Sequence, residues 1–161
     1  MKSLEQRVQA LEDAREIFNL KARYLAAADG GWDRLSHDAD RLAECLTEDV
    51  SWWAPEIGRF NGREEVRALM RGYRTDVPFA YHILTNPFLE VDGDTAKGNW
   101  HLLWQGTDGD GRELWLAGVY DDTFVRTPEG WKIKTLYMKC AYIGPRNEGW
   151  EKLMRDTLVR A

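Results

Sequence analysis

The feature of this chain that most constrains its fold is a change of pattern at Pro78. Before Pro78 apolar residues recur at helical spacing, and after it β-branched and aromatic runs alternate with turn sequences. Helices followed by a meander of strands are typical of an α+β layer, in which the helices cover one face of a curved antiparallel sheet. A chain of 161 residues suits one domain of common size, so we expect a single domain over residues 1–161.

Three helices and a strand are predicted before Pro78. The first helix covers Leu4 to Ala28, and a second apolar stripe predicts another helix from Trp32 to Leu46. A short strand is expected from Val50 to Ala54. Asn61 is followed three residues later by Glu64, which resembles a capping box and predicts a third helix with an asparagine cap.

Four antiparallel strands are predicted after Pro78, because three turn sequences rich in Gly, Asp and Pro divide this part of the chain. Successive side chains of a strand point to opposite faces of the sheet, so the alternation identifies one face as the inner one. The residues expected to face inward and to bind a substrate are Trp52, Trp53, Trp100, Leu102, Trp104, Leu116, Tyr120, Leu136, Met138 and Cys140. From the pattern, they either line an aromatic cavity or simply fill the core.

Composition excludes some classes of function. A net charge of −5 argues against general nucleic-acid binding, which needs a basic face. The N-terminus enters charged helical sequence without an apolar signal segment, and no long apolar run follows, so we expect a cytoplasmic protein without membrane association. Cys45 and Cys140 lie in apolar contexts without partner spacing, which indicates buried thiols in a reducing compartment.

Two polar residues stand out in segments that otherwise read as core. Asp29 ends the first helical segment, and His82 lies in the apolar run from Phe79 to Leu84. If the carboxylate of Asp29 accepts a hydrogen bond from one ring nitrogen of His82, the other nitrogen can act as a general base. The structural alternative is that Asp29 caps a helix and His82 is a hydrogen-bonded core residue.

The order of elements and several local sequences resemble a known family. These sequences are Arg23-Tyr24…Asp29, Glu48-Asp49-Val50-Ser51-Trp52, Phe60-Asn61-Gly62, His82 and Gly118-Val119-Tyr120…Gly130-Trp131-Lys132-Ile133. Over roughly residues 4 to 143 the chain resembles the SnoaL-like branch of the nuclear-transport-factor-two-like superfamily. Within that branch it is most similar to the group of bile acid 7α-dehydratase, scytalone dehydratase and hexachlorocyclohexane dehydrochlorinase.

The resemblance implies a cone-shaped α+β barrel with a deep apolar pocket, in which an Asp–His dyad performs elimination without a cofactor or metal. Asp29 and His82 fall on the dyad positions, and Tyr24 falls on the helix position of an acid or carbonyl-polarising group. Two departures are visible. Trp100 occupies the family's second acidic or histidine position, and Leu136 occupies the position at which some members carry a basic residue.

The expected function is therefore a cofactor-independent dehydratase-type lyase that acts on a hydrophobic cyclic or polycyclic molecule. The alternatives are an isomerase or cyclase of a steroid-like or polyketide-like molecule, and a ligand-binding module without catalysis. The ketosteroid isomerase mechanism is disfavoured, because Ala54 stands where that enzyme has its Asp base.

Further interpretations concern charge, metal and assembly. Arg67 and Arg71 on the third helix, with Arg146 near the C-terminus, are either a solvated basic face or an anchor for an anionic tail or a coenzyme A ester. No metal-binding spacing is present, so no metal site is expected. A homodimer or homotrimer is expected through the outer sheet face, which carries Lys97, Asn99, His101 and Gln105.

Overall fold

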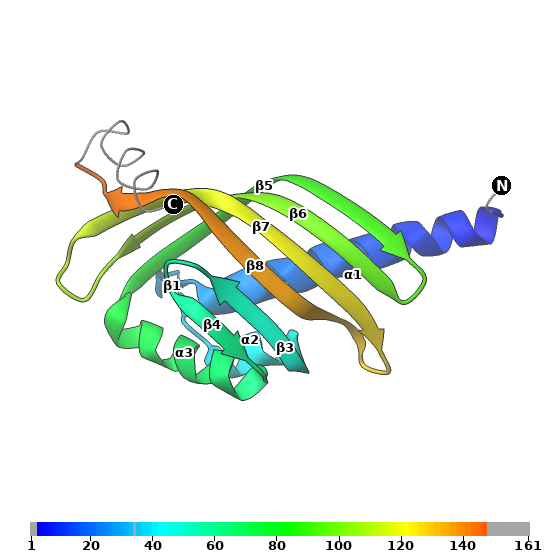
Figure 1. Cartoon of the computed structure of the whole chain (residues 1–161), viewed down its shortest axis with the longest axis horizontal. Coiled ribbons are helices and arrows are strands. Elements are labelled where there is room, and N and C mark those ends of the chain that lie inside the picture. The colour runs from blue at the N-terminus through cyan, green and yellow to red at the C-terminus, as the bar shows by residue number, and fades with distance from the viewer. Residues whose placement is uncertain (1–2, 34, 148–161) are drawn as a thin grey trace.

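The fold is given by a computed structural model that describes residues 3–33 and 35–147 (Figure 1). In chain order the elements are α1 (Leu4–Ala28), β1 (Gly30–Trp32), β2 (Leu35–Ser36), α2 (Ala39–Glu44), β3 (Leu46–Ala54), β4 (Gly58–Asn61), α3 (Arg63–Asp76), β5 (Phe79–Asp92), β6 (Thr95–Thr107), β7 (Glu113–Thr127) and β8 (Gly130–Pro145). The change of pattern at Pro78 therefore separates the helical part from four long strands, as expected.

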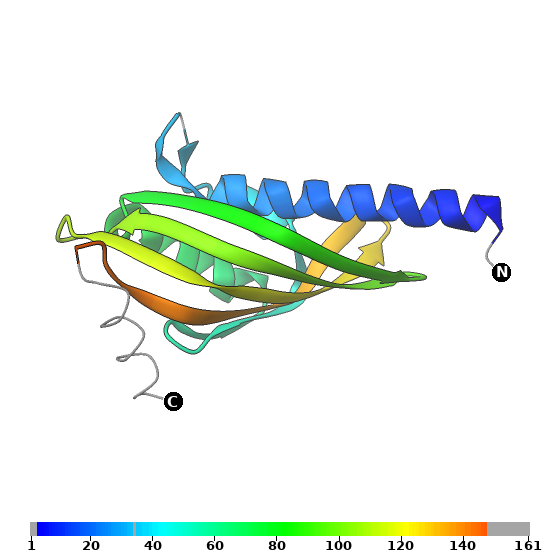
Figure 2. The ribbon, with the colours of Figure 1, turned by 90° about the horizontal axis from the view of Figure 1, so that it is seen from above.

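The strands form one curled sheet in the order β2-β1-β5-β6-β7-β8-β3-β4. The strands β5 to β8 pair antiparallel through hairpins, but β3 pairs parallel with β8. The sheet is thus mixed, and the expectation of antiparallel pairing throughout was wrong at this position. No hairpin turn joins β3 to β8, so the local turn sequences do not dictate their relative direction. α1 runs along the sheet, and its N-terminal turns project beyond the strands (Figures 1 and 2).

The region expected as one helix from Trp32 to Leu46 is instead a small hairpin followed by the short α2. His37 has a φ of 53°, in the left-handed region, which a continuous helix cannot contain. The indole nitrogen of Trp32 donates a hydrogen bond to the carbonyl oxygen of Ala80 at 3.2 Å, which attaches the hairpin to β5. Apolar spacing suggested a helix here, but the backbone conformation of His37 and pairing with the sheet decide otherwise.

The third helix is confirmed as α3, but its expected asparagine cap was wrong. Gly62 occupies the N-cap position with a φ of 90° and provides no side-chain cap. The backbone N–H of Asn61 instead donates a hydrogen bond to the carboxylate of Glu65 at 2.7 Å. The strand β4, which ends at Asn61, was not predicted.

The inner face of the sheet and the helices enclose one hydrophobic core. Eight of the ten expected inward residues lie in it: Trp52, Trp100, Leu102, Leu116, Tyr120, Leu136, Met138 and Cys140. Trp104 is partly buried and packs against this core. Trp53 was wrongly placed, because its ring stacks on Tyr137 at 4.5 Å and Arg59 covers it. Neighbouring residues of a strand point to opposite faces, so Trp52 and Trp53 could not both face inward.

Two further predictions concern the state of the cysteines and the presence of membrane-spanning helices. Cys45 and Cys140 are both free and buried. Among residues 3–33 and 35–147, no helix is long and apolar enough to cross a membrane.

Candidate active site

Asp29 caps the C-terminal end of α1, and the two glycines that follow it lead the chain directly into β1 beside β5. The backbone N–H of Asp29 still bonds to Leu25 in the last helical turn, and Gly30 then pairs with Ala80 of β5. A Cβ atom on Gly30 would lie 2.3 Å from the ring of His37, so no larger residue fits there without rearrangement. Gly30 thus makes room for the ring of His37, and its pairing with Ala80 brings the carboxylate of Asp29 to the start of β5.

The carboxylate of Asp29 holds His82 by two hydrogen bonds to the same oxygen. The ring Nδ1 of His82 lies 2.6 Å from Oδ1 of Asp29, and the backbone N–H of His82 donates to that oxygen at 3.0 Å. Both side chains are largely shielded from solvent, with 7% of Asp29 and 10% of His82 exposed. The ring of His82 also contacts the ring of Trp104 edge to face, with centroids 6.4 Å apart.

This arrangement fixes the orientation of the imidazole. Because an ionised carboxylate only accepts hydrogen bonds, a neutral His82 in this contact carries its proton on Nδ1 and leaves Nε2 as the unprotonated nitrogen. Nε2 takes part in no hydrogen bond with the described residues. The pair therefore has the geometry of a general base oriented by a carboxylate.

Tyr24 is buried on the core side of α1, with 2% of its surface exposed. Its hydroxyl oxygen accepts a hydrogen bond from the indole nitrogen of Trp52 at 2.9 Å, which leaves the phenol proton free to be donated. Burial raises the pKa of the Tyr24 phenol far above its usual value, so the group stays neutral and protonated. Tyr24 precedes Asp29 by five residues, or about 7 Å along the helix axis.

A buried ion pair lies further along the same helix. The ammonium of Lys21 lies 2.6 Å from the carboxylate of Asp122 on β7, and the side chains are 2% and 0% exposed. The Lys21 ammonium lies over the rings of Tyr120, Tyr24 and Trp100, with centroids at 4.0, 5.0 and 5.3 Å.

Burial dominates the acid–base behaviour of this pair. Burial raises the pKa of Asp122 to about 6, although the ammonium of Lys21 acts in the opposite direction. Burial likewise lowers the pKa of Lys21, although Asp122 opposes this shift. This pair was not predicted from the sequence. The available signals were that Lys21 lies one turn before Tyr24 and that Asp122 lies two residues after the inward-facing Tyr120.

The three arginines considered as an anion anchor already have carboxylate partners in the protein. Arg67 contacts Glu64 at 2.8 Å and Asp40 at 3.3 Å, and Arg71 also contacts Asp40 at 3.3 Å. Arg146 lies 2.7 Å from Glu113. The interpretation as a solvated, internally paired face therefore explains these arginines without a ligand.

In the described part of the chain, no three His, Cys, Asp or Glu side chains gather in a group that could hold a metal ion. The remaining histidines are far from forming such a group. His101 is exposed and contacts Asn86, and the Nδ1 of His37 contacts the carbonyl oxygen of Ala28 at 2.8 Å.

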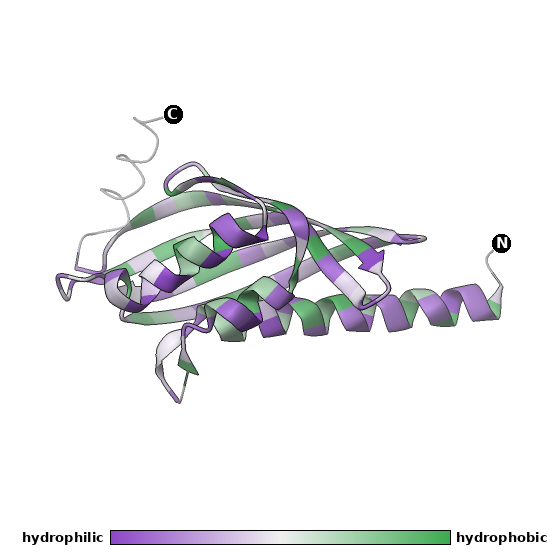
Figure 3. Cartoon of the chain, turned by 90° about the horizontal axis from the view of Figure 1, so that it is seen from below, coloured by the Kyte–Doolittle hydropathy of each residue, from purple (hydrophilic) through white to green (hydrophobic). Residues whose placement is uncertain are grey.

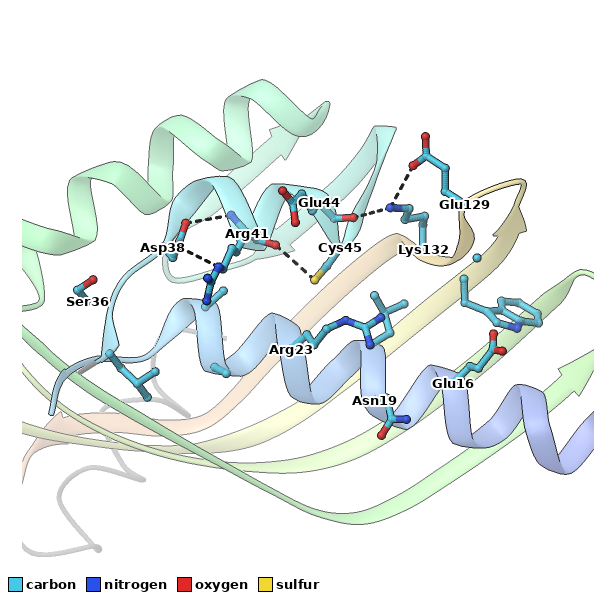
Figure 4. A pocket seen from close by; sticks show the side chains of 16 residues that line it. Glu16, Asn19, Arg23, Ser36, Asp38, Arg41, Glu44, Cys45, Glu129 and Lys132 are labelled. Atoms are coloured by element: carbon cyan, nitrogen blue, oxygen red, sulfur yellow. Dashed lines mark hydrogen bonds and ion pairs between the residues drawn. The ribbon is translucent and has the colours of Figure 1, made fainter. Parts of the chain in front are cut away.

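A cavity of about 760 Å³ lies between α1, α2 and the turn that joins β7 to β8 (Figure 4). Charged side chains line it, including Arg23 of α1, Asp38 before α2, and Lys132 of β8. Neither Asp29 nor His82 belongs to its wall. The lining of this cavity is mixed polar and apolar and does not include the dyad, so we assign the candidate active site from the dyad and the residues around it.

The curled sheet and the helices form a cone-shaped α+β fold, which solved structures of low sequence identity share, including a candidate dehydratase from Streptomyces avermitilis described as belonging to the NTF2-like family. The model of the SnoaL-like domain matches residues 9–137, and the chain belongs to this family. An uncharacterized protein of Mycobacterium tuberculosis (strain H37Rv) is 31% identical over 137 residues, which cover 83% of this chain and 89% of that protein.

Two solved structures illustrate the likeness in fold. A type-3 hexachlorocyclohexane dehydrochlorinase from Novosphingobium barchaimii matches with a TM-score of 0.76 and 23% identity, covering 89% of this chain and 96% of that chain. A protein described as a candidate scytalone dehydratase, from Novosphingobium aromaticivorans, matches with a TM-score of 0.74 and 22% identity, covering 86% and 91%. At these identities the structures show a shared fold. Proteins named for elimination reactions are thus among the solved structures that share this fold.

Proposed function

We propose that this protein is a cofactor-independent lyase, of the dehydratase type, that acts on a hydrophobic cyclic or polycyclic small molecule. The observation that carries the proposal is the contact of 2.6 Å between Asp29 and Nδ1 of His82, in a nearly buried setting. The names of the structural neighbours, a dehydrochlorinase and a candidate dehydratase, support the choice of elimination over other proton-transfer reactions.

In the proposed reaction Nε2 of His82 removes a proton from a carbon of the substrate. The electrons of the broken C–H bond form a C=C bond, and the neighbouring C–O bond breaks with its electron pair going to oxygen. The carboxylate of Asp29 stabilises the imidazolium formed in this step. The imidazolium then gives its proton to the departing oxygen, so the products are an alkene and water and the histidine is neutral again.

Tyr24 is assigned to hydrogen bonding rather than to full proton transfer. Its pKa is raised by burial, so formation of a phenolate would be unfavourable. The bond from Trp52 to its oxygen orients the hydroxyl, and its free proton can polarise a substrate carbonyl or hold the departing oxygen. This role needs only a neutral phenol.

The test is turnover of a panel of hydroxylated cyclic and polycyclic compounds, followed by loss of water and by ultraviolet absorbance of the new double bond. Asp29→Asn keeps the size of the side chain but removes its charge, and we expect a loss of about 100-fold to 10,000-fold in kcat. His82→Ala should lose at least as much. His101→Ala, on an exposed histidine outside the core, is the matched control and should keep full activity.

Other outcomes select the alternatives. Uptake of solvent deuterium without loss of water would indicate an isomerase or cyclase that uses the same dyad. Ligand binding without turnover, altered in affinity by His82→Ala, would indicate a binding module. Turnover that survives in both Asp29→Asn and His82→Ala would overturn the proposed role of the dyad.

A further inference from the structure

The helix α1 carries a second apolar face on the side opposite its core-facing residues. Its core side includes Ile17, Leu20 and Tyr24, each at most 2% exposed. A helix turns by about 100° per residue, so residues 4, 8, 11 and 18 cluster on the opposite side. We call these residues the α1 stripe, and their exposed fractions are 72% for Leu4, 44% for Val8, 73% for Leu11 and 40% for Phe18.

The part of α1 that carries most of the stripe projects from the body of the molecule. Asp13 is the first buried residue of the helix and is held by Arg126 at 2.7 Å. The turns before it extend past the strands, and apolar bands recur along them (Figures 2 and 3). A capping box between Ser3 and Gln6 closes the helix at its start. A short helical extension without tertiary contacts is marginally stable, so packing of the stripe against a partner would stabilise it.

The spacing of the stripe fits a two-stranded coiled coil. The steps of four, three and seven residues place Val8 at a heptad a position and Leu4, Leu11 and Phe18 at d positions. Arg15 occupies the next a position, and a polar residue at a single a position limits stability while it specifies register. The stripe is therefore suited to a partner helix of the same spacing.

The charges beside the stripe favour a second copy of the same chain in parallel orientation. Arg7 falls at a g position and Glu12 at the e position five residues later. In a parallel pair the g residue of one helix faces the e residue of the next heptad on the other helix, so Arg7 would meet Glu12 twice about the two-fold axis. In an antiparallel pair e residues face each other, which would bring the acidic Glu5 and Glu12 together. Neither Arg7 nor Glu12 has an ion pair within the described residues.

We propose that the α1 stripe is a self-association surface, on which α1 of a second copy packs in parallel as a short coiled coil. The two molecular bodies then lie on opposite sides of the helix pair, because each stripe faces away from its own core. This surface is separate from the outer sheet face and from the dyad, and the proposal does not depend on the proposed function.

The direct test is disulfide cross-linking of Val8→Cys under mild oxidation. In a parallel pair the two cysteines at this a position face each other, so a disulfide-linked dimer is expected. Native Cys45 and Cys140 are buried and should not interfere. Glu16→Cys is the matched control, because it is exposed on the same helix but turned about 120° away from the stripe. No cross-link at Val8→Cys, or equal cross-linking of both variants, would overturn the proposal.

Sedimentation across a range of concentrations provides the second measurement. Leu11→Glu should convert dimer to monomer while the rest of the protein keeps its cooperative unfolding transition, because Leu11 makes little contact with its own chain. Arg7→Glu should weaken dimerisation about fivefold, and the added change Glu12→Arg should restore it. A wild-type monomer at all concentrations would overturn the proposal. So would a dimer that survives Leu11→Glu but is lost in Leu103→Glu, an exposed position on the outer sheet face.

Discussion

Replacement of Lys21 by Met should destabilise the protein strongly, because it leaves the carboxylate of Asp122 without its partner. The side chain of Asp122 is 0% exposed, so water cannot replace the ammonium that lies 2.6 Å away. Removal of one partner from a buried ion pair costs about 3–5 kcal/mol. We expect a loss of this size in the free energy of unfolding at pH 7.

The loss should depend on pH, and its sign follows from the raised pKa of Asp122. In the wild-type protein burial raises this pKa from 3.8 to about 6, which corresponds to about 3 kcal/mol. The folded carboxyl thus keeps its proton to a higher pH than the unfolded one. Its contribution to stability is fully present below pH 3.8 and is lost as the pH rises through about 6. Lys21→Met removes the positive charge that opposes this shift, so the pKa of Asp122 in the folded variant lies higher than in the wild-type protein. The cost of ionising the buried carboxyl therefore continues to grow at pH values above about 6. The variant should differ little from wild type near pH 4 and most at neutral pH.

Urea denaturation followed by tryptophan fluorescence at several pH values measures this effect. The double variant Lys21→Met with Asp122→Leu is the control, because replacement of both charges by apolar groups is often neutral or stabilising. We expect it to recover most of the lost stability at pH 7. A loss below about 1 kcal/mol, a loss that is the same at pH 4.5 and 7, or a double variant as unstable as the single one would refute the reasoning.

Three further predictions concern single contacts. Trp52→Phe removes the indole N–H that donates to the hydroxyl of Tyr24, so the free energy of unfolding in urea should fall by about 1–2 kcal/mol. An unchanged free energy would contradict this hydrogen bond. Gly98→Ala should lower the free energy of unfolding by about 1–3 kcal/mol in the same assay, because the added Cβ would lie 2.0 Å from the ring of Trp100. An unchanged free energy would mean that this ring can move aside. Burial raises the pKa of Cys140 to about 12, so a disulfide reagent at pH 8 should label this thiol only after unfolding, and rapid labelling of the folded protein would contradict its burial.

Local patterns were sufficient to predict the large elements and most of the core. The helix α1 and the four long strands follow from spacing and turn residues that lie within one segment of chain. Strand alternation also placed most inward residues correctly, because the side-chain period of a strand is a local property. The prediction for Trp53 was wrong for the same reason, since the alternation that turns Trp52 toward the core turns its neighbour toward the opposite face.

Contacts between distant segments were decided by the tertiary structure. The sequence indicated Asp29 and His82 as polar residues in apolar segments. The distance of 2.6 Å between Oδ1 of Asp29 and Nδ1 of His82, however, depends on how Gly30 pairs with β5. The pairing of Lys21 with Asp122 likewise depends on which strand lies opposite the helix.

The sequence by itself therefore determined the long helices, the four long strands and most of the faces that they bury, because those properties arise from neighbours along the chain. Only the tertiary structure decided which buried polar groups meet. Packing fixes those distances to within a fraction of an ångström, and that precision separates a hydrogen-bonded acid–base pair from two isolated polar residues.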